Sequence, residues 1–144
     1  MKTLSLLRTL ILVTTLCLSS FSYAESVVVV VSATSPVSKL DKEQVANLFL
    51  GKSSSYPDGS AAAVPIEQTD ATAAHEEFHK SITEKSASQL KSYWSKMIFS
   101  GKGTAPKEVS SNAELLKLIS SNPAMIGYVD KTAADKTVKV VFAP

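Results

Sequence analysis

The chain has 144 residues, of which 44% are apolar and 19% are charged, and its formal net charge is +2. This length accommodates one domain, with room for a targeting segment. The composition excludes a disordered tail, a collagen-like repeat and a disulfide-stapled mini-protein.

The first 24 residues have the pattern of a secretory signal peptide. Basic residues precede the short apolar stretch 9–18, and Ala24 ends a small-residue cleavage site. We therefore predict a signal peptide at 1–24, a single mature domain at 25–144, and a periplasmic location with no membrane span after cleavage. Lipidation at Cys17 is the alternative, and it is disfavoured because a leucine precedes this cysteine where a small residue is required.

The mature chain would have a balanced charge. Cleavage leaves 13 lysines against 13 acidic residues, with neither cysteine nor arginine. A chain without a basic excess gives no reason to expect binding to nucleic acid or to an anionic membrane. The absence of cysteine suits an oxidising compartment and excludes disulfides and thiolate metal sites. The absence of arginine removes the side chain that best grips a phosphate or carboxylate.

The first half of the mature chain begins with a strand and a helix. Five consecutive valines at 27–31 predict a strand that is covered on both faces, because the apolar run is unbroken. Asp41 and Gln44 form a capping box that begins a helix, and Gly51 suits the left-handed position after its end. Residues 61–66 are interpreted as a second strand.

Three further helices and two strands are expected. The second helix spans about 70–82, while Ser86 with Gln89 and Ser111 with Glu114 are capping boxes that begin the third and fourth. Strands are expected at 125–129 and 138–142. Strands that alternate with helices predict an α/β layer structure. Tyr93 and Trp94 lie at helical spacing with apolar residues, which favours core packing over a binding role.

The segment 75–79 (HEEFH) matches the H-E-x-x-H pattern of zinc hydrolases. On a helix, His75 and His79 share one face, and Glu76 would be the general base. A third ligand would have to come from an acidic residue such as Glu84, Glu108 or Glu114, none of which lies in a recognisable motif. We favour the interpretation that the two histidines form a solvated helix flank, so that no metal and no cofactor are expected; a weak metal site and a zinc hydrolase are the alternatives.

Two polar segments before helices are candidate oxyanion sites. Thr34 and Ser35 precede the first helix, and Asp70 and Thr72 lie at the start of the second. Free backbone N–H groups and the positive end of the helix dipole attract anions at such places. Plain helix capping is the alternative role for these residue types.

Several segments resemble the phosphate-type periplasmic substrate-binding proteins. Segments 40–52 (LDKEQVANLFLGK) and 56–59 (YPDG) are similar to that family's run ending in I-F-x-G-k and W-x-d-G. Segments 99–101 (FSG) and 122–129 (NPAMIGYV) are similar to its F-s-G and n-P-G-a-I-G-Y-v motifs. The motifs keep their order over nearly all of the mature chain. The resemblance implies one lobe of a type II periplasmic-binding-protein-like fold, with a small mixed β-sheet flanked by helices.

The resemblance also places a binding site at the start of the second helix. The family's R-x-D-x-S-G-T motif aligns so that Gln68 stands in place of its arginine, Asp70 matches its aspartate, and Thr72 stands in place of its serine. The glycine and threonine of the motif are replaced by Ala73 and Ala74. The charged ligand is therefore missing, and tight phosphate binding is not expected.

Three functions follow from these observations. The first is an ABC-transporter substrate-binding-like protein, not an enzyme, that binds a small oxyanion such as phosphate weakly through Thr34, Ser35, Gln68, Asp70 and Thr72. The second is a periplasmic adaptor that reuses the lobe to bind a protein partner without a ligand. The third, the zinc hydrolase, is the least favoured.

Overall fold

The structure is a computed structural model that describes residues 27–144. The expected signal peptide at 1–24, and Cys17 within it, lie outside the described residues. Within residues 27–144, no helix is long and apolar enough to cross a membrane.

The centre of the fold is a five-stranded mixed sheet with the strand order β3-β2-β4-β1-β5. β1 lies between β4 and β5 and is antiparallel to both, whereas β2 is parallel to its neighbours β3 and β4. The expected small mixed sheet is therefore confirmed. The strands are β1 (Val27–Ser32), β2 (Val64–Gln68), β3 (Lys107–Val109), β4 (Met125–Asp130) and β5 (Val138–Phe142).

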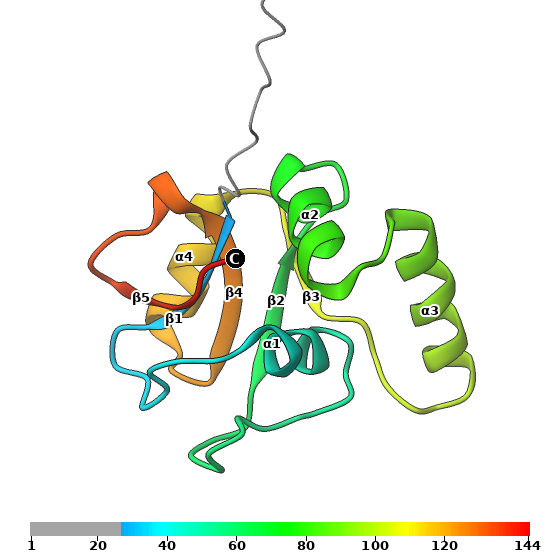
Figure 1. Cartoon of the computed structure of the whole chain (residues 1–144), viewed down its shortest axis with the longest axis horizontal. Helices are drawn as coiled ribbons and strands as arrows, with labels where there is room; N and C mark the ends of the chain where they lie inside the picture. Colours follow the sequence, from blue (N-terminus) through cyan, green and yellow to red (C-terminus); the bar gives the residue numbers. More distant parts are fainter. Residues whose placement is uncertain (1–26) are drawn as a thin grey trace, which may run out of the picture.

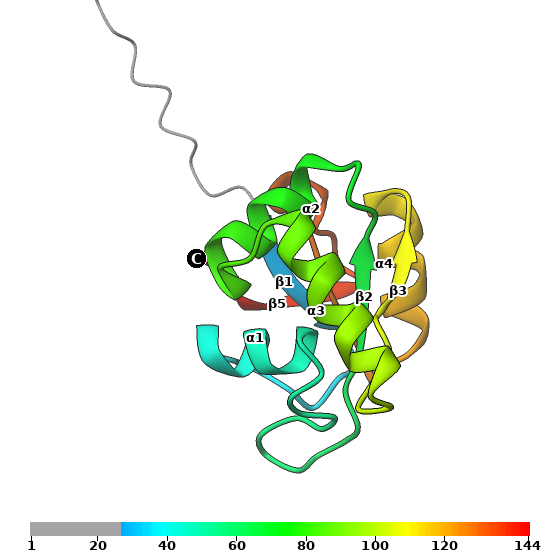
Figure 2. The ribbon, with the colours of Figure 1, turned by 90° about the vertical axis from the view of Figure 1, so that its right-hand side faces the viewer.

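Helices cover both faces of this sheet (Figure 1). Figure 2 shows α4 on one side of β2 and β3, with α1 and α2 on the other. The helices are α1 (Lys42–Phe49), α2 (Ala73–Phe78), α3 (Ala87–Phe99) and α4 (Asn112–Ser121), with a π-helical turn η1 (His79–Thr83) and a 3₁₀ turn η2 (Lys131–Ala133).

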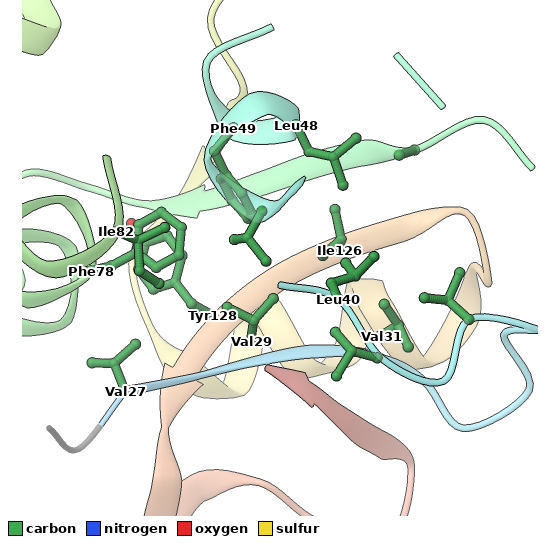
Figure 3. Packing of buried hydrophobic residues seen from close by; sticks show 14 of the residues in the cluster. Val27, Val29, Val31, Leu40, Leu48, Phe49, Phe78, Ile82, Ile126 and Tyr128 are labelled. Carbon is green, nitrogen blue, oxygen red and sulfur yellow. The ribbon is translucent and has the colours of Figure 1, made fainter. Parts of the chain in front are cut away.

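The valines of β1 are buried on both faces, as the unbroken apolar run predicted. Val27, Val29 and Val31 pack in the larger core with α1, α2 and η1, where Phe49, Phe78 and Tyr128 gather (Figure 3). The two valines between them pack in the second core with α4. Successive side chains of a strand point to opposite faces, so this one strand joins the two cores.

The predicted capping boxes largely form. Asp41 accepts the backbone N–H of Gln44, whose side chain accepts the N–H of Asp41 in return, and Ser86 and Gln89 do the same for α3. Ser111 caps α4, but the Glu114 carboxylate accepts the N–H of the preceding serine instead. The boundaries set by these local bonds agree with the sequence.

The second strand differs from its prediction. It spans 64–68 instead of 61–66, because 61–63 belong to a small irregular hairpin in which Ala62 bridges Ser55. β2 continues through the polar Glu67 and Gln68, which pair with β3, a strand that the sequence analysis missed.

The second helix is also shorter than expected. Regular α-helix covers 73–78 after its N-cap Thr72, and the chain continues as the π-helical turn 79–83. It ends at Glu84, whose φ of 57° is left-handed. π-helical turns occur often at functional sites.

Helix α3 lies at the β3 side of the molecule, apart from the other helices in Figure 1. Trp94 is 8% exposed, and its ring lies against Gly51. The Tyr93 hydroxyl donates to the carbonyl oxygen of Leu50 at 2.6 Å. Trp94 is thus a packing residue, as the sequence analysis favoured, and Tyr93 ties α3 to the end of α1.

Candidate functional site

Functional candidates gather at the sheet edge where β2 and β4 end. The two strands are parallel, and the register pairs Val27 at the start of β1 with Asp130 at the end of β4. The turn 69–72 leaves this edge and leads into α2 (Figure 1). Because carboxyl ends of parallel strands meet at one edge, polar residues from β2, α2 and α4 converge here.

The structure does not bring all the predicted anion ligands together. Thr34 and Ser35 follow β1 at the opposite edge of the sheet, because β1 runs antiparallel to β4. Thr34 bonds the hydroxyl of Ser32 at 2.9 Å, and the hydroxyl of Ser35 accepts the N–H of Val37. The prediction of one site that includes Thr34 and Ser35 is therefore wrong; neither caps α1, whose N-cap is Asp41.

The side-chain amide of Gln68, at the end of β2, makes hydrogen bonds within the protein. Its Nε2 donates to Asn112 Oδ1 at 2.7 Å and to the carbonyl oxygen of Tyr128 at 3.2 Å. Asn112 in turn donates to the Asp130 carboxylate at 2.6 Å. With Gln68 only 3% exposed, this network of Gln68, Asn112 and Asp130 is closed, and neither Nε2 bond is directed at a ligand.

Thr72 has the capping role that was the alternative for it. Its hydroxyl accepts the N–H of His75 at 3.2 Å and donates to the carbonyl of Thr69 at 3.0 Å. Asp70, which lies between Thr69 and Thr72 in sequence, is exposed. This short turn is therefore satisfied largely by its own side chains.

Acidic side chains surround the same turn. The pKa of Glu108 is raised by burial and then by the charges of Glu67 and Asp70. Glu108 therefore lies close enough to Glu67 and Asp70 for their negative charges to act on its carboxyl group. Such a field disfavours an anion and favours a cation.

The two histidines do not form a solvated flank. His75 is 5% exposed and His79 is 1% exposed, and their ring centres lie 4.5 Å apart. Burial, followed by the nearby His79, lowers the pKa of His75, which favours the neutral imidazole. The buried stripe of α2 is wider than predicted, because Ala74 and Phe78 are buried next to the histidines.

A third buried residue, Glu67, completes the histidine cluster. His79 Nε2 lies 3.0 Å from Glu67 Oε1, and the ligand atoms of Glu67, His75 and His79 all lie within 4.8 Å of one another. The acidic partners proposed from the sequence do not take this place in the cluster. Glu84 is exposed and pairs with Lys42 at 2.7 Å, and Glu114 bonds Ser110.

Sequence reasoning missed Glu67 and Asn112. The available signal was a charged residue at the end of an apolar strand, directly before the polar turn that precedes the histidines. An open pocket of about 510 Å³ borders the cluster and is lined in part by Asp70, His75 and His79. This pocket gives the buried cluster a path to solvent.

The fold is that of the substrate-binding proteins of phosphate ABC transporters. No protein-family model and no curated protein matches the chain, but solved structures do. An ABC-type phosphate transport receptor from Vibrio cholerae superimposes with a TM-score of 0.63 at 17% identity, over 81% of this chain and 45% of that chain. The resemblance and the fold class expected from the sequence are confirmed.

Two other solved structures give the same result. A phosphate ABC transporter substrate-binding protein from Clostridium perfringens, determined with bound phosphate, has a TM-score of 0.65 and 18% identity, over 81% of this chain and 44% of that chain. PstS from Borrelia burgdorferi has a TM-score of 0.60 and 14% identity, over 81% of this chain and 46% of that chain. This chain therefore spans less than half the length of the structures that it matches.

Proposed function

We propose that the chain is an exported, periplasmic binding module, not an enzyme, with a single phosphate-receptor-like lobe at 25–144 and a degenerate oxyanion site. The fold supports binding over catalysis, because the similar solved structures are transport proteins. The observation on which the proposal rests is Gln68. It stands where the resemblance places arginine, and its amide already bonds Asn112 and Tyr128.

The remaining residues at this edge support weak binding only. Thr72 and Asp70 border the turn 69–72, but the three carboxylates described above oppose an anion. A guanidinium contributes charge-assisted hydrogen bonds of roughly 1.5–3 kcal/mol each. Losing two such bonds weakens affinity by on the order of 10²-fold or more.

Calorimetric titration of the mature protein with phosphate and sulfate tests this proposal. We expect a dissociation constant for phosphate of about 1 mM or weaker, with a neutral solute as the control. Micromolar binding of phosphate would contradict the degenerate site. The Gln68→Arg variant should bind phosphate at least about tenfold more tightly, and Gln68→Lys should gain less because ammonium is a point charge. Equal affinity of all three would remove Gln68 as the cause.

A protein adaptor is the second candidate, and one surface feature favours it. Phe99 is 96% exposed and Ile98 is 55% exposed at the end of α3. Large apolar side chains side by side on a surface are typical of an interaction site. Sedimentation velocity tests self-association directly: an oligomer that the Ile98→Ser and Phe99→Ser variants dissociate supports the adaptor, and a monomer with clear anion affinity rejects it.

A further inference from the structure

Glu67, His75 and His79 place three potential metal ligands in one buried cluster. Two imidazole nitrogens and a carboxylate oxygen lie within 4.8 Å of one another. The residues come from two elements, β2 and the α2–η1 segment, so the tertiary fold is needed to assemble them. Two histidines four residues apart on a helix share a face, as zinc ligation requires.

The hydrogen bonds of Thr83 favour one tautomer of His79. The Thr83 hydroxyl donates its proton to the carbonyl oxygen of His79 at 3.1 Å. The same hydroxyl lies 2.9 Å from His79 Nδ1, so it accepts a proton from that nitrogen. In this tautomer the proton is on Nδ1, and Nε2 can present its lone pair to a metal ion beside Glu67. A ring N–H held by a neighbouring group is the usual support of a metal-ligating histidine.

The two facing atoms lack a satisfactory protein partner. Within the described residues, neither Glu67 Oε1 nor His79 Nε2 makes a hydrogen bond, although they lie 3.0 Å apart and are almost completely buried. A lone pair and a carboxylate oxygen at this separation repel each other unless a positive charge lies between or beside them. Buried polar atoms are nearly always satisfied in proteins, and a cation bound by both atoms would satisfy this pair.

We propose that Glu67, His75 and His79 bind one divalent metal ion, and that the ion is Zn²⁺. Nitrogen and carboxylate donors suit zinc, and two histidines with one glutamate leave the fourth tetrahedral position open. That position would face the pocket beside Asp70, through which the ion reaches the cluster. Binding of Zn²⁺ here does not depend on binding of an oxyanion.

Zinc binding to the mature, untagged protein tests this site. We expect one Zn²⁺ per chain by competition with a chromophoric chelator, and visible absorption bands of tetrahedral Co²⁺ when cobalt replaces zinc. The isosteric Glu67→Gln variant should lose at least about 100-fold in zinc affinity, and His75→Ala should lose as much. Glu84→Gln is the matched control, because it removes an exposed carboxylate of this region, and it should bind zinc like the wild type.

Folding is checked by circular dichroism on each variant, so that a lost site is distinguished from a lost fold. If both site variants prove unfolded, the wild-type cobalt spectrum and histidine NMR shifts on zinc addition still decide the outcome. Absence of cobalt bands, or zinc affinity that Glu67→Gln leaves unchanged, would overturn the proposal. The approach of His79 to Glu67 would then be a pairing within the protein without a metal ion. Phosphate titration of the same samples is independent, so failure of the zinc site leaves the oxyanion result unaffected.

Discussion

Glu67 and Gln68 are neighbours on β2, yet their side chains lie in opposite environments. Gln68 faces α4 and is satisfied by Asn112 and Tyr128, in a network that extends to Asp130. Glu67 faces α2 and lies against His79 without a hydrogen bond between them. Both residues are almost fully buried. Burial alone therefore does not distinguish the two side chains; they differ in whether their buried polar atoms make hydrogen bonds.

The largest expected effect on stability comes from breaking the hydrogen-bond network of Gln68, Asn112 and Asp130. Asn112→Ala removes one of the two acceptors of Gln68 Nε2 and the amide that donates to the part-buried Asp130 carboxylate. We expect a loss of about 2–3 kcal/mol in the free energy of unfolding, measured with urea. Zinc affinity should stay within about threefold of wild type, because the network faces away from the histidines.

A control at the other end of α4 isolates this effect. Ser121 is exposed and its hydroxyl donates to the carbonyl of Leu118 in its own helix, so Ser121→Ala should change stability by less than about 0.5 kcal/mol. If Asn112→Ala weakened zinc binding as strongly as Glu67→Gln, the two sides of β2 would form one site, and the comparison would be wrong.

Local patterns in the sequence predicted much of the fold, but they did not predict which residues distant in sequence come into contact. The capping boxes and the burial of β1 on both faces depend on residues within a few positions of one another. The placement of Glu67 against His79 depends on how β2 packs under α2, which no short pattern contains. The H-E-x-x-H match supplied two members of the cluster, but the flank interpretation failed because the helix buries a wider stripe than Ala74, Phe78 and Ile82 alone.

The anion site illustrates the same limit. Gln68, Asp70 and Thr72 lie at one edge of the sheet because they are close together in sequence, and their role in binding stays a prediction. Thr34 and Ser35 were grouped with them only because both segments precede helices. The antiparallel pairing of β1 with β4 sends them to the far edge, and strand direction is not encoded in the residues of the loop itself.

On the side of β2 that faces the histidines, a smaller but more specific effect is expected at Thr83. Thr83→Val keeps the shape of the side chain and removes the acceptor for His79 Nδ1–H. Zinc affinity should fall about tenfold, since groups that orient a ligating histidine contribute at this level. Thr83→Ser should restore affinity, because it keeps the hydroxyl. Ser81→Ala, in the same turn but bonded to the carbonyl of Glu77, should leave zinc affinity unchanged; equal losses in both variants would point to a general loosening of the turn.

The smallest effect is expected at Tyr128, which lies between the two environments. Its ring stacks on Phe78 with centres 4.0 Å apart, and its hydroxyl accepts the backbone N–H of Gln68 at 3.3 Å. Tyr128→Phe keeps the stacking and loses one acceptor, so we expect about 1 kcal/mol of destabilisation at neutral pH.

The pH dependence of the same variant provides a sharper test. Burial, and then the charge of Glu67, raise the pKa of Tyr128 well above the ordinary value of 10.0. The folded state therefore holds the phenol proton more strongly than the unfolded state does. The stability linked to this proton is fully present below pH 10 and is lost as the pH rises further, because the unfolded chain then ionises first. Urea unfolding at pH 9 and 11 should show a steeper loss for the wild type than for Tyr128→Phe; identical slopes would mean that the hydroxyl reaches solvent and does not separate the two sides of β2.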